Sequence, residues 1–221
     1  MRFPRPPGRG AHRSIRMVAG AAFATAGLAL AGAGVFAGLN ATAANTSPQQ
    51  VNSGTLKLTM AAATGSAGFT TTLSNVAPGD VVNRYVDLTN GGTLDGQALT
   101  LGASDSTPTK LTTDATNGLR VSVTQCSGAA WAVSTGTCGP GGTTSVLANN
   151  VAVSSLSAPA TLIAGSVPAG TVLRLQVAIS LPNQNETTVN GVLPTSTIQG
   201  LTANLTWTFS EAQRAATTTN S

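Results

Sequence analysis

Histidine is nearly absent from this 221-residue chain: the one present, His12, lies before an apolar run near the start. Histidine is the usual general base of Ser-His and Cys-His catalysis and the commonest zinc ligand. Its absence after residue 37 argues against hydrolases of those types and against a zinc enzyme. The acids, Asp80, Asp105 and Asp114 among them, show no ligand spacing. We therefore predict no catalytic residue, no metal site, no cofactor and no enzymatic activity.

Charge is also scarce, since charged residues make up 8% of the chain. The net positive charge comes from five arginines within residues 2–16, and from Gly38 onward there are six basic and seven acidic side chains. A chain this close to neutral lacks the basic surface that nucleic-acid binding requires. The remainder is rich in Thr, Ser, Ala, Asn and Gly, which suits extended strands better than helices supported by Glu–Lys pairs.

Residues 1–37 have the order of a secretory signal peptide, because the arginines are followed by an uncharged run from Met17 to about Ala37. A transmembrane anchor is the alternative, since about 20 apolar residues span a bilayer. Ala and Gly dominate the run, which weakens insertion and favours cleavage. No paired-arginine motif and no cysteine accompany the run, so we expect the general export route without a lipid anchor. The mature protein would be secreted, extracellular or at the cell surface, and free of the membrane.

Two signal cleavage points compete. Cleavage after Ala37 leaves Gly38 as the new N-terminus, whereas cleavage after Ala43 fits a small-x-small rule slightly better. The first choice leaves an arm, residues 38–52, that has no strong fold of its own. Its small and apolar residues are the expected assembly contacts: Leu39, Ala41, Ala43 and Ala44.

The chain has two cysteines, Cys126 and Cys138, separated by SGAAWAVSTGT. In an exported protein this spacing predicts a disulfide that clasps a hairpin or loop. Closing so short a loop contributes about 3 kcal/mol in the chain-entropy model. A metal site would need two more ligands, and no histidine is available to supply them. We expect Trp131 to pack over the disulfide, the alternative being a contact with a sugar or a surface.

Alternating apolar and polar residues predict eight to ten short strands separated by turns, with no helical repeat. Polar loops are expected at 107–117 and 182–194. We predict an all-β fold, an antiparallel jelly-roll-like β-sandwich that forms a single domain over residues 53–210 and is followed by a polar tail, 211–221. The expected strands are 56–60, 69–73, 82–88, 94–101, 119–123, 146–156, 160–164, 172–181 and 201–209.

Three stretches resemble one family. The signal end GLALAGAGVFAGLNATAA followed by SGTLKL resembles signals cut by the dedicated peptidase SipW. NVAPGDVVNRYVDLTNGGTLDG resembles a segment of the biofilm matrix fibre protein TasA and its relative camelysin, and LTANLTWTFSEAQ resembles their last core strand. The resemblance implies cleavage after Ala37 by a SipW-type peptidase and a secreted jelly-roll subunit that assembles into fibres. Camelysin is described as a metallopeptidase, but this chain has no His-Glu-x-x-His motif.

Two functions follow. In the first, the protein is a non-enzymatic structural subunit of the extracellular matrix that self-associates into fibres, as the arm of one copy adds a strand to an open sheet edge of the next. Such a head-to-tail contact does not close, so it propagates as a filament. In the second, the protein is a monomeric secreted adhesin or binding module of immunoglobulin-like topology, and the arm is a linker.

Overall fold

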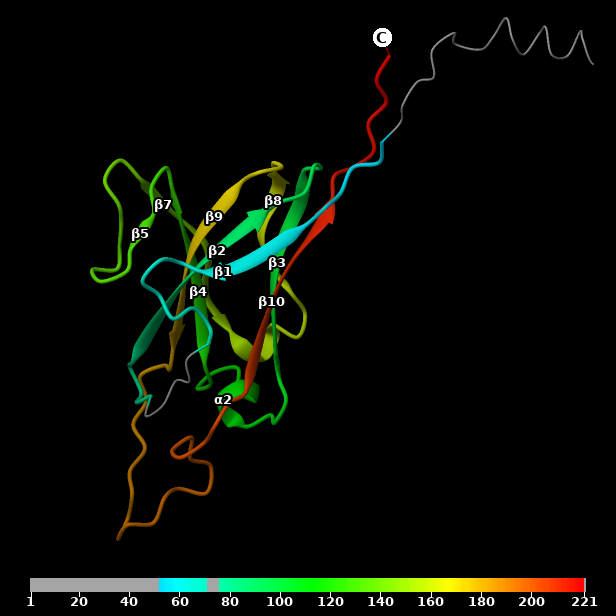
Figure 1. The fold of residues 1–221 in the computed structure, drawn as a ribbon. Helices are drawn as coiled ribbons and strands as arrows, with labels where there is room; N and C mark the ends of the chain where they lie inside the picture. Colours follow the sequence, from blue (N-terminus) through cyan, green and yellow to red (C-terminus); the bar gives the residue numbers. More distant parts are fainter. Residues whose placement is uncertain (1–51, 71–75, 221) are drawn as a thin grey trace, which may run out of the picture. The chain divides into compact units, whose positions relative to one another are not determined.

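The computed structural model describes residues 52–70 and 76–220. The chain from Ser53 to Ser221 forms one compact unit, and nearly all of its secondary structure is antiparallel β-sheet (Figure 1). The prediction of an all-β antiparallel sandwich is confirmed. The predicted signal peptide, both cleavage points and the arm residues lie outside the described residues; these are Ala37, Gly38, Leu39, Ala41, Ala43 and Ala44.

The sandwich is built from two sheets of unequal size. The larger sheet has five strands in the order β1-β2-β9-β4-β7, and the smaller sheet has three in the order β10-β3-β8. The larger sheet comprises β1 (Leu58–Ala62), β2 (Val81–Asn90), β9 (Val172–Ser180), β4 (Arg120–Ser127) and β7 (Thr143–Ala152). The smaller sheet comprises β10 (Leu205–Gln213), β3 (Gly96–Asp105) and β8 (Ala160–Val167).

The core lies between the two sheets because every second residue of the central strands is apolar. On β9 the alternation that the sequence predicted is confirmed, with Leu173, Leu175, Val177 and Ile179 all buried. The inward residues of the other strands pack against them; these include Val86, Leu88, Val121, Val123, Leu99, Leu101, Leu162 and Val167.

Asn90 ends β2 with a fully buried side chain. Its Nδ2 donates to the carbonyl oxygens of Leu94 (3.0 Å) and Val167 (3.1 Å), and its Oδ1 accepts from the Gly92 N–H (3.1 Å). Asn90 thereby fixes the turn after β2 and ties it to β8 in the other sheet. A buried amide with all three of these bonds made stabilises one corner geometry over others.

Gly92 lies where two separate stretches of the chain meet. A Cβ atom at this position would lie 2.3 Å from the carbonyl oxygen of Thr55, so only glycine fits. That same oxygen accepts hydrogen bonds from the N–H groups of Thr93 (2.8 Å) and Leu94 (3.0 Å). The stretches SGTLKL and NGGTL, which carry much of the resemblance, are therefore in direct contact.

Two of the differences between the structure and the sequence prediction concern one end of the sandwich. The expected loop 107–117 contains one helical turn, α2 (Lys110–Thr113), which is too short to show a helical period. Strand β10 begins at Leu205 rather than Leu201, because the Asn204 N–H donates to the Asp105 carboxylate (3.1 Å) in place of a ladder bond.

The remaining elements are short. A two-stranded hairpin, β5 (Trp131–Ala132) and β6 (Thr137–Cys138), follows β4, and a 3-10 turn, η1 (Val153–Ser155), follows β7. The predicted strand 146–156 is therefore a strand and a turn. The predicted strand 69–73 is not seen in its described part, since Phe69 lies in a turn, and residues 71–73 lie outside the described residues.

Candidate functional site

The outer edge of β10 has no neighbouring strand among the described residues. The smaller sheet has three strands, and β10 is one of its two outer strands, so one edge of β10 forms no strand pairing within the described parts of the chain. Its inward residues Leu205, Trp207 and Phe209 are only half-buried, while Thr206 and Thr208 face outward and are exposed. An unpaired strand edge offers a row of backbone donors and acceptors to another strand.

A groove of about 760 Å³ runs beside β10. Its apolar wall includes the ring of Phe69, which stacks on Trp207 with 5.6 Å between ring centroids and 23° between ring planes. Arg84, the one charged residue on the inward face of β2, also lines the groove. Apolar walls beside an open strand edge are the arrangement that β-strand addition requires.

Residues 198–204 of the loop from β9 to β10 line this groove. The loop lies at the same end of the sandwich as α2 (Figure 1). Two bonds connect them: Lys110 Nζ donates to the Ser196 carbonyl oxygen (3.1 Å), and the Thr109 hydroxyl donates to the Thr202 carbonyl oxygen (3.1 Å). Within the loop, Glu186 accepts from the Thr197 hydroxyl and from the Ile198 N–H. The hydroxyl of Thr197 contributes most to lowering the pKa of Glu186.

Asp105 joins β3 to β10 at this end. Its carboxylate accepts from the Thr107 N–H (3.0 Å), the Thr112 hydroxyl (2.7 Å) and the Asn204 N–H (3.1 Å). Desolvation is the largest single effect and raises the pKa of Asp105, but the three hydrogen bonds together outweigh it, so the pKa lies below its usual value. The charge of Asp105 therefore serves to fix the start of β10.

Glu211 is at the opposite end of β10. It continues the inward phase of Leu205, Trp207 and Phe209, and the pairing with β3 shifts register between Ser210 and Ala212. Both carboxylate oxygens are buried without a hydrogen-bond partner, and they lie directly over Gly96, where a Cβ atom would be 2.3 Å from Oε2. Burial raises the pKa of Glu211. An inward charge on an edge strand is one way in which proteins limit unwanted pairing.

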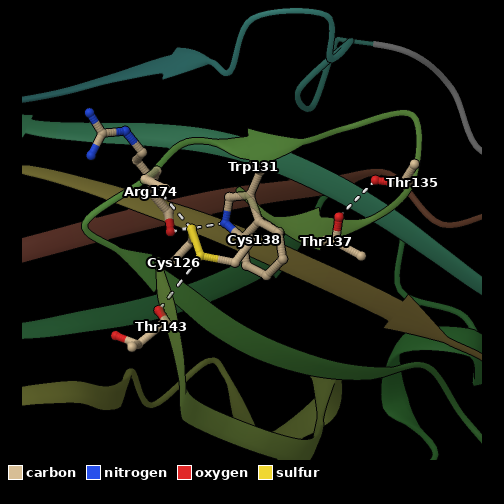
Figure 2. Close-up of a disulfide and its surroundings, with 8 residues drawn as sticks. Cys126, Trp131, Thr135, Thr137, Cys138, Thr143 and Arg174 are labelled. Carbon is tan, nitrogen blue, oxygen red and sulfur yellow. Dashed lines mark hydrogen bonds between the residues drawn. A yellow bond between two sulfur atoms is a disulfide. The ribbon is translucent and has the colours of Figure 1, made fainter. Parts of the chain in front are cut away.

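The predicted disulfide between Cys126 and Cys138 forms (Figure 2). Cys126 belongs to a second, smaller hydrophobic cluster, and Cys138 packs against it. Trp131 packs in the same cluster, as expected, and is 8% exposed. Its Nε1 donates to the Arg174 carbonyl oxygen (3.1 Å), and its ring centroid is 5.5 Å from that of Tyr85. These contacts hold the β5–β6 hairpin on the outer face of the five-stranded sheet.

The model of the family described as camelysin metallo-endopeptidase matches residues 14–128, more than half of the chain. The chain belongs to this camelysin family. The match ends just after β4, inside the disulfide-closed loop 126–138 that we call the clasp. Strands β5 to β10 therefore lie beyond it, as does the third of the stretches on which the resemblance rested. No curated protein matches the chain.

One solved structure, titled "AvmM Catalyzes Macrocyclization in Alchivemycin A Biosynthesis", is similar at 11% identity with a TM-score of 0.26. The similarity covers 74% of this chain and 91% of that one. At such a TM-score the similarity supports no statement about function.

The camelysin family description implies a metal, so the ligands available here decide whether one fits. No three His, Cys, Asp or Glu side chains gather in the described parts of the chain, and both cysteines are in the disulfide. The carboxylates serve elsewhere: Asp80 accepts from the Ala77 N–H, Asp95 from the Ala169 N–H, and Asp114 from the Thr116 and Asn117 N–H groups. These residues do not fit a tetrahedral zinc site.

The sequence predicted the disulfide-closed loop, but neither the inward position of Glu211 nor the open edge of β10. Glu211 was assigned to the polar tail, although its position two residues after Phe209 continues the inward alternation. The open edge could not be read locally, because it depends on which strands pair across the whole chain. No helix among residues 52–70 and 76–220 is long and apolar enough to cross a membrane.

Proposed function

We propose that this camelysin-family protein is a secreted, non-enzymatic matrix subunit whose N-terminal arm, residues 38–52, adds a strand to the β10 edge of the next copy. The observation that carries the proposal is the unpaired β10 edge, with half-buried Leu205, Trp207 and Phe209 beside a groove that has both apolar and polar walls. A further strand paired with the β10 edge would bury these three side chains more fully. The resemblance to TasA supports the same function, and the camelysin family membership supports a secreted protein of this type, although the family description names a peptidase.

The dimensions of the arm suit this task. An extended strand rises about 3.3 Å per residue, so residues 38–52 reach about 50 Å, while the nine residues of β10 span about 30 Å. Small side chains such as Ala41, Ala43 and Ala44 fit a narrow groove better than large ones. Cleavage after Ala37 leaves all of them on the arm, whereas cleavage after Ala43 removes most of them.

Tryptophan fluorescence tests this pairing directly. A mature chain lacking residues 38–52 and carrying Trp131→Phe retains one tryptophan, Trp207, in the groove. Adding a synthetic peptide of residues 38–52 is expected to shift the Trp207 emission to shorter wavelength in a saturable way, because the strand excludes water. A scrambled peptide is the control. No shift at any peptide concentration would contradict strand addition at β10 and favour the monomeric adhesin.

We also propose that the protein has no peptidase activity, because its donors do not fit a zinc site. The secreted protein, incubated with denatured casein and added zinc, is expected to leave the substrate intact. Cleavage that a chelator abolishes would contradict this proposal.

A further inference from the structure

No charged residue occurs anywhere between Arg120 and Arg174. This stretch supplies the β5–β6 hairpin, β7 and β8, and nearly all of β4. Strands β7 and β8 are outer strands of the two sheets and contact each other. Neither β7 nor β8 therefore carries a charged side chain of its own, and the charge that contacts β7 is Arg120 of β4, whose Nη1 donates to the Asn150 carbonyl oxygen in the second half of the strand (3.3 Å).

The outer edge of β7 is unpaired within the described parts of the chain, since this strand pairs with β4 alone. Its first four residues, Thr143 to Val146, are all exposed, and the Val146 side chain is 65% exposed. Proteins usually protect such an edge with lysine, proline, an inward charge or a bulge, because it pairs readily with another strand. Residues Thr143 to Val146 have none of these, and the bulge in the pairing with β4 comes only at Leu147.

The other edges are better protected. Strand β1 has five residues and follows Lys57, and the C-terminal end of β10 carries Glu211 and is followed by Arg214, which leaves residues 205–209 as the open part of that edge. Strand β8 is flanked by Pro159 and Pro168, and its pairing with β3 shifts register twice. The ten-residue β7 is as long as any strand of the fold and contains no proline.

The pairing of β7 with β4 is regular over the first four residues of β7. Residues Thr143 to Val146 pair in unbroken register with Ser127 to Thr124 of β4, whereas the register shifts beyond this point and Asn150 has a φ of 50°. The disulfide supports the start of the strand: Cys138 Sγ lies 3.7 Å from the Thr143 carbonyl oxygen (Figure 2), and a Cβ on Gly142 would come within 2.5 Å of that sulfur. The clasp thus presents a short, rigid, uncharged edge.

We propose that residues 143–147 of β7 pair antiparallel with the same residues of a second copy, across a two-fold axis. A second copy is the partner that fits, because an uncharged edge offers nothing to select an acidic or basic partner and does not repel its own copy. Such a contact is isologous and closes at two copies, so it joins molecules laterally and does not extend a filament. Only a few residues take part, so the association is weak and depends on concentration.

The contact is independent of strand donation by the arm and is tested without it. The mature chain lacking residues 38–52 leaves the compact unit from Ser53 intact. Sedimentation velocity over a concentration series is expected to show a reversible monomer–dimer equilibrium for this chain. Val146→Lys is expected to weaken dimerisation at least tenfold, since the axis lies at Ser145 and the two introduced charges become diagonal neighbours about 7–8 Å apart. Thr161→Lys, an exposed residue on β8, is the matched control and is expected to leave it unchanged.

A charge-swap pair separates loss of pairing from loss of folding. Val146→Lys and Val146→Glu are each expected to be monomeric alone and to form a heterodimer when mixed. A chain that is monomeric at every concentration, an association that survives Val146→Lys, or an equal loss with Thr161→Lys would each overturn the proposal. Failure of filament growth in the chain that retains the arm would contradict strand donation alone.

Discussion

Asn90 shows how much of this fold rests on single polar side chains. It satisfies backbone groups of Gly92, Leu94 and Val167 from a fully buried position. The sequence indicated a turn at Asn90-Gly91-Gly92 but not its burial, because the partner on β8 lies 77 residues further along the chain. Local pattern predicts where a strand ends, while long-range packing decides what the last residue contacts.

Asn90→Ala is expected to lower the free energy of unfolding by about 2–4 kcal/mol, because it leaves buried backbone groups of two segments unpaired. Urea unfolding measures the change. Asn83→Ala, at an exposed position of the same strand, is the control and is expected to change it by less than about 0.5 kcal/mol. Equal effects of the two substitutions would show that the Asn90 network contributes little.

Glu211 predicts a dependence of stability on pH. Its pKa is raised in the folded state, so the folded protein binds a proton more readily there than the unfolded chain does, and stability falls as pH rises through that pKa. Glu211→Gln is therefore expected to be more stable than the parent at pH 7, with the difference shrinking toward about pH 4. Thermal unfolding midpoints of both proteins at several pH values measure this. A parent that is the more stable protein at pH 7 would contradict the assignment.

The lowered pKa values of Asp105, Asp114 and Glu186 act in a different range. Their stabilisation is present above the unfolded pKa of about 4 and is lost as pH falls through the folded value. Loss of stability below pH 4 therefore belongs to these groups, and a rise between pH 7 and pH 4 belongs to Glu211.

At the level of elements, the disulfide clasp was predictable and the sheet edges were not. Two cysteines in a chain with a predicted export signal leave one intramolecular pairing, and Trp131 lies between them in the sequence. In contrast, β10 pairs with β3 over about 100 residues of sequence, as Trp207 opposite Ala103 illustrates. Alternation within a strand cannot show which strand will lie beside it, so the open edge came from the structure alone.

Replacing both Cys126 and Cys138 by serine is expected to lower the free energy of unfolding by about 2–3 kcal/mol, the value for a loop of this length. The main core should persist, because the clasp encloses a separate cluster on the outer face of the sheet. Urea unfolding gives the loss, and circular dichroism checks the β-sheet content. Loss of the whole fold would show that the two clusters are one cooperative core.

For the whole molecule, two different sheet edges support the two modes of association that we propose. The β10 edge has a groove with apolar and polar walls and half-buried side chains that a donated strand would cover, which favours head-to-tail growth. The β7 edge is uncharged and self-complementary, which favours lateral pairing. Together the two contacts would build filaments that associate side by side, as expected of an extracellular matrix.

Electron microscopy of the secreted protein across a concentration series, with its N-terminus determined by mass spectrometry, tests the matrix-subunit function most directly. We expect a chain beginning at Gly38 that forms filaments above a threshold concentration, and a chain lacking residues 38–52 that forms none. A chain that begins at Ala44, or that stays monomeric at every concentration, would contradict assembly by the N-terminal arm.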